Sequence, residues 1–196
     1  MAIKLQGHAI ETILEEHEAA FRASFGPENI KLLEQITDII IQTFQRGNKI
    51  LLCGNGGSAA DAQHIAAEFV GRFKRERRSL PAIALTTDTS ILTALANDYS
   101  YETVFARQVE GLGQRGDILI ALSTSGTSKN VIEAVKRAKE MGLVVVGCTG
   151  KTGGELKKLA DFNFAAGSTK TPHVQEMHIT ALHAISEAVE DALFPS

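Results

Sequence analysis

The sequence predicts an α/β fold, namely a three-layer sandwich with a parallel sheet of about five strands, preceded by an N-terminal helical arm. Two observations support this prediction. From about residue 47 onward, short apolar runs alternate with longer segments of helical periodicity. The runs are almost uninterrupted by polar residues, which is typical of parallel strands that helices cover on both faces.

Two helices are expected ahead of the first strand. Between residues 5 and 25, apolar side chains recur among many glutamates at helical intervals, and Gly26-Pro27 ends the pattern. A second helical pattern covers residues 30–44 and is followed by Gly47-Asn48, a C-cap signal. The arm and the second helix carry more apolar surface than one small sheet needs, so we expect them to be buried between subunits.

The remaining chain alternates between strands and helices, and a last helix is expected over residues 172–194. No internal repeat or linker divides it. We therefore expect one structural domain, in which residues 1–46 form the oligomerisation arm and the first helix of the core, and residues 47–196 form the rest. The expected strands are Lys49–Cys53, Ala82–Leu85, Asp117–Leu122, Leu143–Cys148 and Phe162–Ala165.

Composition and charge exclude several classes of protein. The chain has 196 residues, with 20 Lys and Arg against 23 Asp and Glu, so its formal charge of −3 disfavours a general nucleic-acid binder or a membrane-surface protein. No apolar stretch approaches the ~20 residues that span a bilayer, and no signal peptide is recognisable. The two cysteines, Cys53 and Cys148, each end an apolar run and are expected in the core. A reducing, cytoplasmic location is therefore expected.

Glycines gather where three of the expected strands end, in the segments 54–58, 123–128 and 147–154. Ligands of open α/β sheets bind beyond the carboxyl ends of the strands, where loops lead into helix N-termini. Tight turns alone would also explain these glycines. The segment Ser123-Thr124-Ser125-Gly126-Thr127-Ser128 favours phosphate binding over a plain turn, because its hydroxyls and amides can surround a phosphate. It matches neither the P-loop nor the dinucleotide fingerprint, which disfavours nucleotide binding.

His64 and Glu68 lie four residues apart in an expected helix, about 40° around and 6 Å along it. A histidine and a carboxylate on one helix face can ligate a divalent metal or act as an acid/base pair. The same spacing also occurs on ordinary solvated surfaces, and both interpretations stay open at this point.

The last helix offers further candidates. His183 lies among apolar residues and could be a core histidine, whereas His173 and His178 are expected at the surface. Gln175 and His183 are eight residues apart, about 12 Å along a helix. A helical side chain leans toward the N-terminus by default, so geometry alone does not bring Gln175 to the same metal as His183.

Six motifs follow one another in an order and spacing that resemble the bacterial phosphoheptose isomerases. These enzymes are single sugar-isomerase (SIS) domains of flavodoxin-like architecture with an N-terminal helical arm, and the similarity extends from about Gly47 to the C-terminus. The motifs are Gly54-Asn55-Gly56-Gly57-Ser58, Asp61-Ala62-Gln63-His64 with Glu68, Thr86-Thr87-Asp88-Thr89-Ser90, Ala96-Asn97-Asp98-Tyr99, Ser123-Thr124-Ser125-Gly126, and Gln175-Glu176-x-His178 with His183.

The resemblance implies a reaction and an assembly. The family interconverts D-sedoheptulose 7-phosphate and D-glycero-D-manno-heptose 7-phosphate, the first step toward the ADP-heptose of lipopolysaccharide. The resemblance also implies a cytoplasmic homotetramer with active sites at subunit interfaces and one zinc ion per subunit. No nucleotide or redox cofactor, nucleic acid or membrane partner is expected.

The resemblance also implies a role for each matched residue. The zinc ligands would be His64, Glu68, Gln175 and His183, of which Glu68 and His183 would also be the catalytic pair and His64, Glu68 and Gln175 would also contact the substrate. The phosphate would be bound by Ser123, Thr124, Ser125 and Ser128. The sugar would be positioned by Asn55, Gly56, Gly57, Asn97 and Asp98.

The chemistry of a ketose-to-aldose shift suits these residue types. A proton leaves the carbon beside a carbonyl, an enediol(ate) forms, and a proton returns to the neighbouring carbon, which requires a base, an acid and a stabilised oxyanion. Glu68 is the natural base, His183 the natural acid, and zinc would polarise the oxygens. A carboxylate that binds zinc is a weaker base, and the sequence does not resolve this conflict.

Two other functions fit the same fold. The replication-initiator-associating SIS proteins have a similar length, and the ending Ala192-Leu193-Phe194-Pro195 resembles theirs. They bind a protein and do not turn over a sugar, and their sequences lack the equivalents of Glu68 and His183. A sugar-phosphate sensor would keep the phosphate loop but would not need His64 and Glu68. The presence of Gly56, Gly57, Glu68 and His183 favours the enzyme.

Overall fold

The sheet has the predicted parallel architecture. We describe residues 9–195 of a computed structural model, so the expected helix start at Leu5 lies outside the described residues. The strands are β1 (Ile50–Cys53), β2 (Ala82–Ala84), β3 (Ile118–Ser123), β4 (Val144–Thr149) and β5 (Phe162–Ala165). All neighbouring pairs are parallel and their order is β2-β1-β3-β4-β5, the flavodoxin order. The fold prediction is confirmed, and each strand begins within one residue of its expected start.

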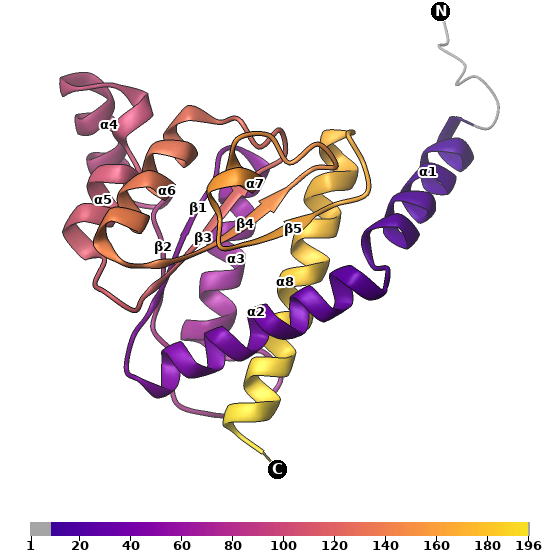
Figure 1. Cartoon of the computed structure of the whole chain (residues 1–196), viewed down its shortest axis with the longest axis horizontal. Coiled ribbons are helices and arrows are strands. Elements are labelled where there is room, and N and C mark those ends of the chain that lie inside the picture. The colour runs from indigo at the N-terminus through magenta and orange to yellow at the C-terminus, as the bar shows by residue number, and fades with distance from the viewer. Residues whose placement is uncertain (1–8, 196) are drawn as a thin grey trace, which may run out of the picture.

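Helices cover both faces of the sheet (Figure 1). Two precede it, α1 (Ala9–Ser24) and α2 (Pro27–Gln45), and Pro27 stands at the first position of α2, where its missing N–H costs nothing. The others are α3 (Gly57–Val70), α4 (Thr89–Asp98), α5 (Ala106–Leu112), α6 (Lys129–Met141), α7 (Leu156–Leu159) and α8 (Thr171–Leu193), with the 3₁₀ turn η1 (Tyr101–Thr103).

Alternate residues of the central strands enter two separate cores. Ile50 and Leu52 of β1 face a core that α2, α3 and α8 complete, whereas Leu51 and Cys53 face the core under α5, α6 and α7. Both faces of the central strands β1, β3 and β4 are therefore buried, which explains their uninterrupted apolar runs. Cys53 and Cys148 are free and buried as expected, and burial raises the pKa of each thiol to about 12. Neither thiol is a nucleophile at neutral pH.

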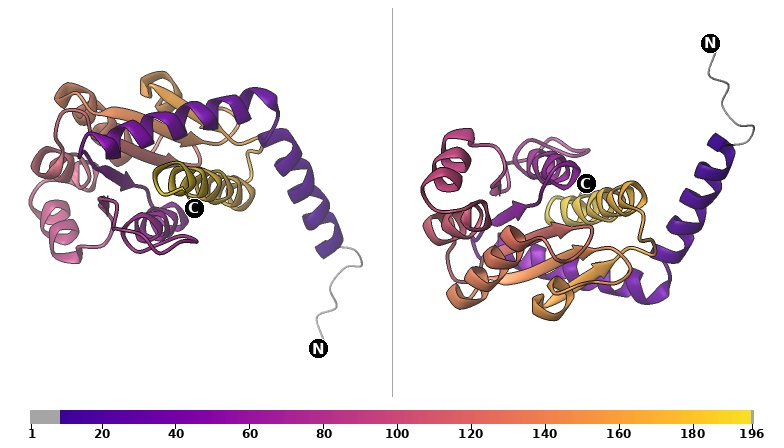
Figure 2. Two further views of the ribbon diagram at one scale, coloured as in Figure 1. Left: turned by 90° about the horizontal axis from the view of Figure 1, so that it is seen from below. Right: turned by 90° about the horizontal axis from the view of Figure 1, so that it is seen from above.

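Helix α1 projects at one end of the molecule, with its C-terminal half against the start of α8 (Figures 1 and 2). Several large apolar side chains on it are exposed, among them Ile13 at 54% and Leu14 at 62%. None of the helices in residues 9–195 is long and apolar enough to cross a membrane.

The histidines near the start of α8 are buried, so the prediction that His173 and His178 lie at the surface is wrong. His173 is 5% exposed and His178 is fully buried, with its Nε2 3.0 Å from the carbonyl oxygen of Thr149. The N-terminal half of α8 packs against α1, β4 and β5 as well as α3. Helical periodicity identifies one buried face and does not reveal a helix enclosed on several sides.

The amino ends of β1 and β3 are held together by Asp117, whose side chain is fully buried. Its carboxylate accepts hydrogen bonds from the backbone N–H groups of Lys49 and Gln114, from the Asn48 amide, and from the Lys49 ammonium at 2.6 Å. Burial alone would raise the pKa of Asp117, but these donors outweigh burial and lower it. Asp117 is therefore a charged, fully partnered anchor.

Candidate active site

His64, Glu68 and His183 form one cluster at the contact of α3 with α8. The Nε2 atom of His64 lies 3.0 Å from Glu68 Oε1 and 3.2 Å from His183 Nε2. Helices α3 and α8 run in the same direction, because Gln175, His183 and Glu190 of α8 contact successively later residues of α3 and the loop after it. This packing brings His183 to His64, which lies 119 positions earlier in the sequence.

The electrostatics of the cluster favour the neutral form of His183. Burial lowers the pKa of His183, and the neighbouring His64 lowers it further, against the opposing effect of Glu68. Its ring packs against that of Phe73, with centroids 5.7 Å apart. A neutral imidazole offers one free lone pair, which can bind a metal or accept a proton.

The geometry of the cluster fits a zinc ion. Zn–N bonds of about 2.0–2.1 Å in a tetrahedral site place neighbouring ligand atoms about 3.3 Å apart. The separations of 3.0 and 3.2 Å between the ligand atoms lie close to that value. One ligand atom from each residue lies within 4.8 Å of the others. Two imidazoles and one carboxylate would leave the fourth position open, as catalytic zinc sites do.

Gln175, the fourth predicted ligand, lies elsewhere in this chain. Its amide packs over Gly57 so closely that a Cβ atom on this glycine would meet Gln175 Nε2 at 2.5 Å. Gly57 precedes His64 by seven residues of α3, about 10 Å along the helix. Gln175 therefore borders the first glycine loop, and its role as a zinc ligand stays a prediction.

The predicted phosphate loop follows β3 and leads into α6. The hydroxyl of Ser123 lies 2.9 Å from that of Ser128 and accepts the N–H of Gly126, while Ser125 Oγ accepts the N–H of Thr127. Gly126 has a φ of +70°, and a Cβ there would meet the carbonyl oxygen of Gly153. The hydroxyls thus converge at the N-terminus of α6, where free N–H groups and the helix dipole favour an anion.

Asn55 connects the first glycine loop with the phosphate loop. Its side chain exchanges two hydrogen bonds with Asn130, at 2.9 and 2.8 Å, and also accepts the hydroxyl of Tyr101 at 3.0 Å. Asn130 and Tyr101 were not among the predicted site residues, because only the tertiary fold brings them to Asn55.

Asn97 and Asp98 lie at the exposed end of α4. The Asn97 amide donates to Asp98 Oδ1 at 2.9 Å. Within residues 9–195, no hydrogen bond joins these two side chains to the other predicted site residues. Their role in positioning the sugar stays a prediction.

A buried carboxylate that the sequence did not reveal holds the segment beside His183. Glu190 accepts the backbone N–H groups of Phe73, Lys74 and Arg75 and pairs with Arg77 at 2.8 Å. Burial alone would raise the pKa of Glu190, but these donors outweigh it and lower the pKa. Glu190 thereby fixes Phe73 against the imidazole of His183.

Asp61, near the cluster, has a hydrogen-bonding environment and a pKa that the sequence does not reveal. One carboxylate oxygen, Oδ2, is buried and has no hydrogen-bond partner among the described residues. Burial raises the pKa of Asp61 to about 6, although His64 lowers it. The carboxylate therefore lacks the donors that a structural carboxylate normally has.

Comparison with known proteins gives a consistent result. The family model described as "SIS domain" matches residues 17–150. The phosphoheptose isomerase of Roseiflexus sp. (strain RS-1) is 58% identical over 163 residues, which cover 83% of each chain. That of Campylobacter concisus is 51% identical over 93% of this chain and 96% of its own. Among solved structures, a phosphoheptose isomerase from Neisseria gonorrhoeae has 41% identity and a TM-score of 0.84, covering 93% of this chain and 98% of its own.

Proposed function

The chain belongs to the SIS-domain family of phosphoheptose isomerases, and on that premise we propose that it interconverts D-sedoheptulose 7-phosphate and D-glycero-D-manno-heptose 7-phosphate. It is an aldose–ketose isomerase, so the enzymatic prediction is confirmed. The proposed reaction would be the first step toward the ADP-heptose of lipopolysaccharide. The non-catalytic alternatives find no support in the relatives, which carry the isomerase name.

One observation carries the proposal. The hydroxyl loop at the start of α6 and the His64–Glu68–His183 cluster are connected through Asn55 and the N-terminal turns of α3. The cluster lies about 10 Å along α3 from the first glycine loop. An extended substrate whose phosphate is far from its carbonyl, such as a 7-phosphate of a 2-ketose, would reach from the hydroxyl loop past the first glycine loop to the cluster. The phosphate would bind at the loop and the C1–C2 end at the cluster.

In the proposed mechanism, Glu68 takes a proton from C1 of the ketose and returns it to C2 after the enediol(ate) has formed. His183 donates a proton to the C2 oxygen and accepts one from the C1 hydroxyl, so that it ends the reaction in the state in which it began. The hydrogen bond between His64 and Glu68 orients the carboxylate. When bound by His64, Glu68 and His183, zinc would polarise the substrate oxygens.

We also propose that the active protein is a homotetramer with its active sites at subunit interfaces. The exposed apolar side chains of α1 support the role of residues 1–46 as an oligomerisation arm, because such a patch is normally covered in a soluble protein. Light scattering at micromolar concentration should give four protomers. Replacing Ile13 and Leu14 by Asp should give a smaller species, and a monomeric wild type would contradict this part of the proposal.

An isomerisation assay tests the function. Purified protein is incubated with sedoheptulose 7-phosphate or with fructose 6-phosphate, and the aldose is quantified by NMR, with and without a chelator. We expect heptose 7-phosphate from the first substrate, little turnover of the second, and loss of activity on chelation that added zinc restores. Absence of turnover of sedoheptulose 7-phosphate by zinc-loaded protein would refute the function, whereas full activity after chelation would refute only the role of zinc.

A further inference from the structure

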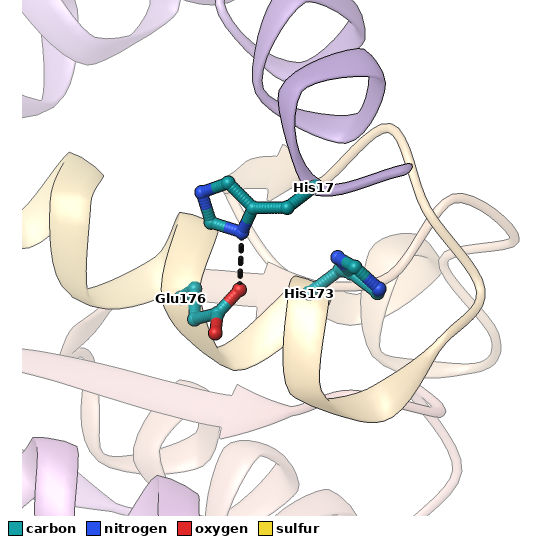
Figure 3. A group of neighbouring side chains, drawn as sticks. All are labelled: His17, His173 and Glu176. Carbon is teal, nitrogen blue, oxygen red and sulfur yellow. Dashed lines mark hydrogen bonds and ion pairs between the residues drawn. The ribbon is translucent and has the colours of Figure 1, made fainter. Parts of the chain in front are cut away.

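A second cluster of histidine and carboxylate side chains lies at the contact of α1 with the start of α8 (Figure 3). It consists of His17 from α1 and His173 and Glu176 from α8. His17 Nδ1 lies 2.5 Å from Glu176 Oε2, and the rings of His17 and His173 have centroids 5.9 Å apart. One ligand atom from each of the three residues lies within 4.8 Å of the other two.

His173 is the unusual member of this cluster. It is one of the buried polar residues, and its Nδ1 has no hydrogen-bond partner among the described residues. Buried ring nitrogens normally have a partner, because an unpaired polar atom costs about 1–3 kcal/mol. With the ring proton on Nε2, Nδ1 carries a free lone pair, which is what a metal ion requires.

The donor set indicates the kind of metal. Imidazole nitrogens suit zinc and neighbouring transition metals, whereas magnesium and calcium prefer sites made of oxygen ligands. For tetrahedral zinc, His17 Nδ1 and Glu176 Oε2 would have to separate from 2.5 Å to about 3.3 Å. Both side chains are partly exposed, at 38% and 52%, so no core packing opposes this movement.

The surroundings leave room for the ion and its remaining ligand. A cavity of about 450 Å³ lies beside the cluster and is lined by His173 together with Glu16, Ser168 and Lys170. Glu16 and Lys170 form an ion pair at 2.5 Å that also connects α1 with the segment before α8. A water molecule in this cavity can complete a four-coordinate site with three protein ligands.

We propose that His17, His173 and Glu176 bind a divalent transition metal ion, with zinc as the best fit, at a site separate from His64, Glu68 and His183. The ion would cross-link α1 to the start of α8 and so fix the direction in which the arm projects. This inference does not depend on the proposed isomerase activity, because it concerns residues outside the proposed reaction.

The proposal is tested by measuring zinc per protomer in a variant whose other cluster, His64–Glu68–His183, lacks one ligand. The His183→Asn variant is stripped of metal, dialysed against micromolar zinc, and analysed for zinc per protomer. We expect one zinc ion, and its loss or at least a tenfold weaker affinity when His17→Asn is added. Glu18→Gln, a neighbouring exposed substitution on α1, is the matched control and should retain the ion.

Cobalt spectroscopy supplies the second measurement. Cobalt bound to the His183→Asn protein should give a visible ligand-field spectrum that disappears with His17→Asn and, separately, with Glu176→Gln. Circular dichroism confirms that each variant is folded. Equal zinc content and equal spectra with and without His17 would overturn the proposal and leave the cluster as a plain His–Glu ion pair.

Discussion

The two edges of the sheet differ in how their buried carboxylate oxygens are hydrogen-bonded. At the amino edge, Asp117 is surrounded by donors and its pKa is lowered. Near the carboxyl edge, Asp61 has a buried oxygen with no partner in the described chain, and its pKa is raised to about 6. Both are single aspartates beside apolar segments, so composition alone does not separate them.

This difference indicates that polar groups at the amino edge stabilise the fold, whereas those near the carboxyl edge are available to a ligand. Full hydrogen bonding offsets the cost of burying a charge, whereas an unpaired polar group costs free energy unless something else binds it. The unpaired nitrogens of His173 and His178 and the open His64–Glu68–His183 cluster also lie toward the carboxyl side. Substitutions at the two edges should therefore separate activity from stability.

The largest effect is expected for Glu68→Gln, which should lower kcat for sedoheptulose 7-phosphate by about 10³-fold or more, since the base is removed. The melting temperature should change little, because within residues 9–195 the Glu68 side chain bonds only to His64. The exposed substitution Glu76→Gln serves as the control. Turnover close to that of the wild type would remove Glu68 from its proposed role.

Asp117→Asn should have the opposite effect, lowering stability while leaving turnover unchanged. The amide cannot replace a charged acceptor of four donors, and we expect the free energy of unfolding to fall by about 2–3 kcal/mol. The kcat of the remaining folded protein should be unchanged. Urea titration compares the variant with Asp191→Asn, an exposed ion-pair control expected to cost about 0.5 kcal/mol or less. Equal stability of the two variants would contradict the role of Asp117.

The pH dependence of stability is a further test of how the hydrogen-bonded carboxylates stabilise the fold. A lowered pKa in the folded state means that Asp117 and Glu190 stabilise the protein above their unfolded pKa values, about 4. That stability is lost as the pH falls through the folded values. Urea midpoints measured from pH 7 to pH 3 should therefore drop below about pH 4, and Asp117→Asn should flatten this drop. An unchanged slope in the variant would contradict this.

A smaller effect is expected at the phosphate loop. Ser125→Ala removes an exposed hydroxyl that the proposal assigns to the phosphate, so KM should rise about tenfold with kcat nearly unchanged. Ser90→Ala, another exposed serine, is the control. A KM equal to that of the wild type would place the phosphate elsewhere.

The smallest effect is expected for Asp61→Asn, which should stabilise the protein at pH 7 by about 1 kcal/mol or less, because the side chain is only partly buried. With a pKa raised from 3.8 to about 6, Asp61 costs stability as the pH rises through that interval. Thermal melts at pH 4 and pH 7 should show the gain only at pH 7. A loss of stability at pH 7 would mean that Asp61 has a partner.

Local patterns predicted much of the fold and part of the site. Strands β1, β3 and β4 were predictable because both of their faces are buried, and the pairing of His64 with Glu68 follows from helical spacing alone. The hydroxyl loop was recognisable because its residues are consecutive. The role of each site residue came from resemblance to a family.

Contacts between distant segments were not predictable in this way. Nothing in the periodicity of α8 shows that it runs parallel to α3, so the contact of His183 with His64 and that of Gln175 with Gly57 appear only in the folded chain. The burial of His173 and the anchoring of residues 73–75 by Glu190 depend on several elements packing around one helix. Such enclosure leaves no periodic signal.

Following sedoheptulose 7-phosphate in D₂O by NMR tests whether the carboxyl-edge cluster performs the isomerisation. We expect that zinc-loaded wild-type protein forms the aldose 7-phosphate and exchanges a C1 hydrogen for deuterium, and that folded Glu68→Gln does neither. Aldose formation by Glu68→Gln at the rate of the wild type, or no reaction with the wild type, would contradict this role of the cluster.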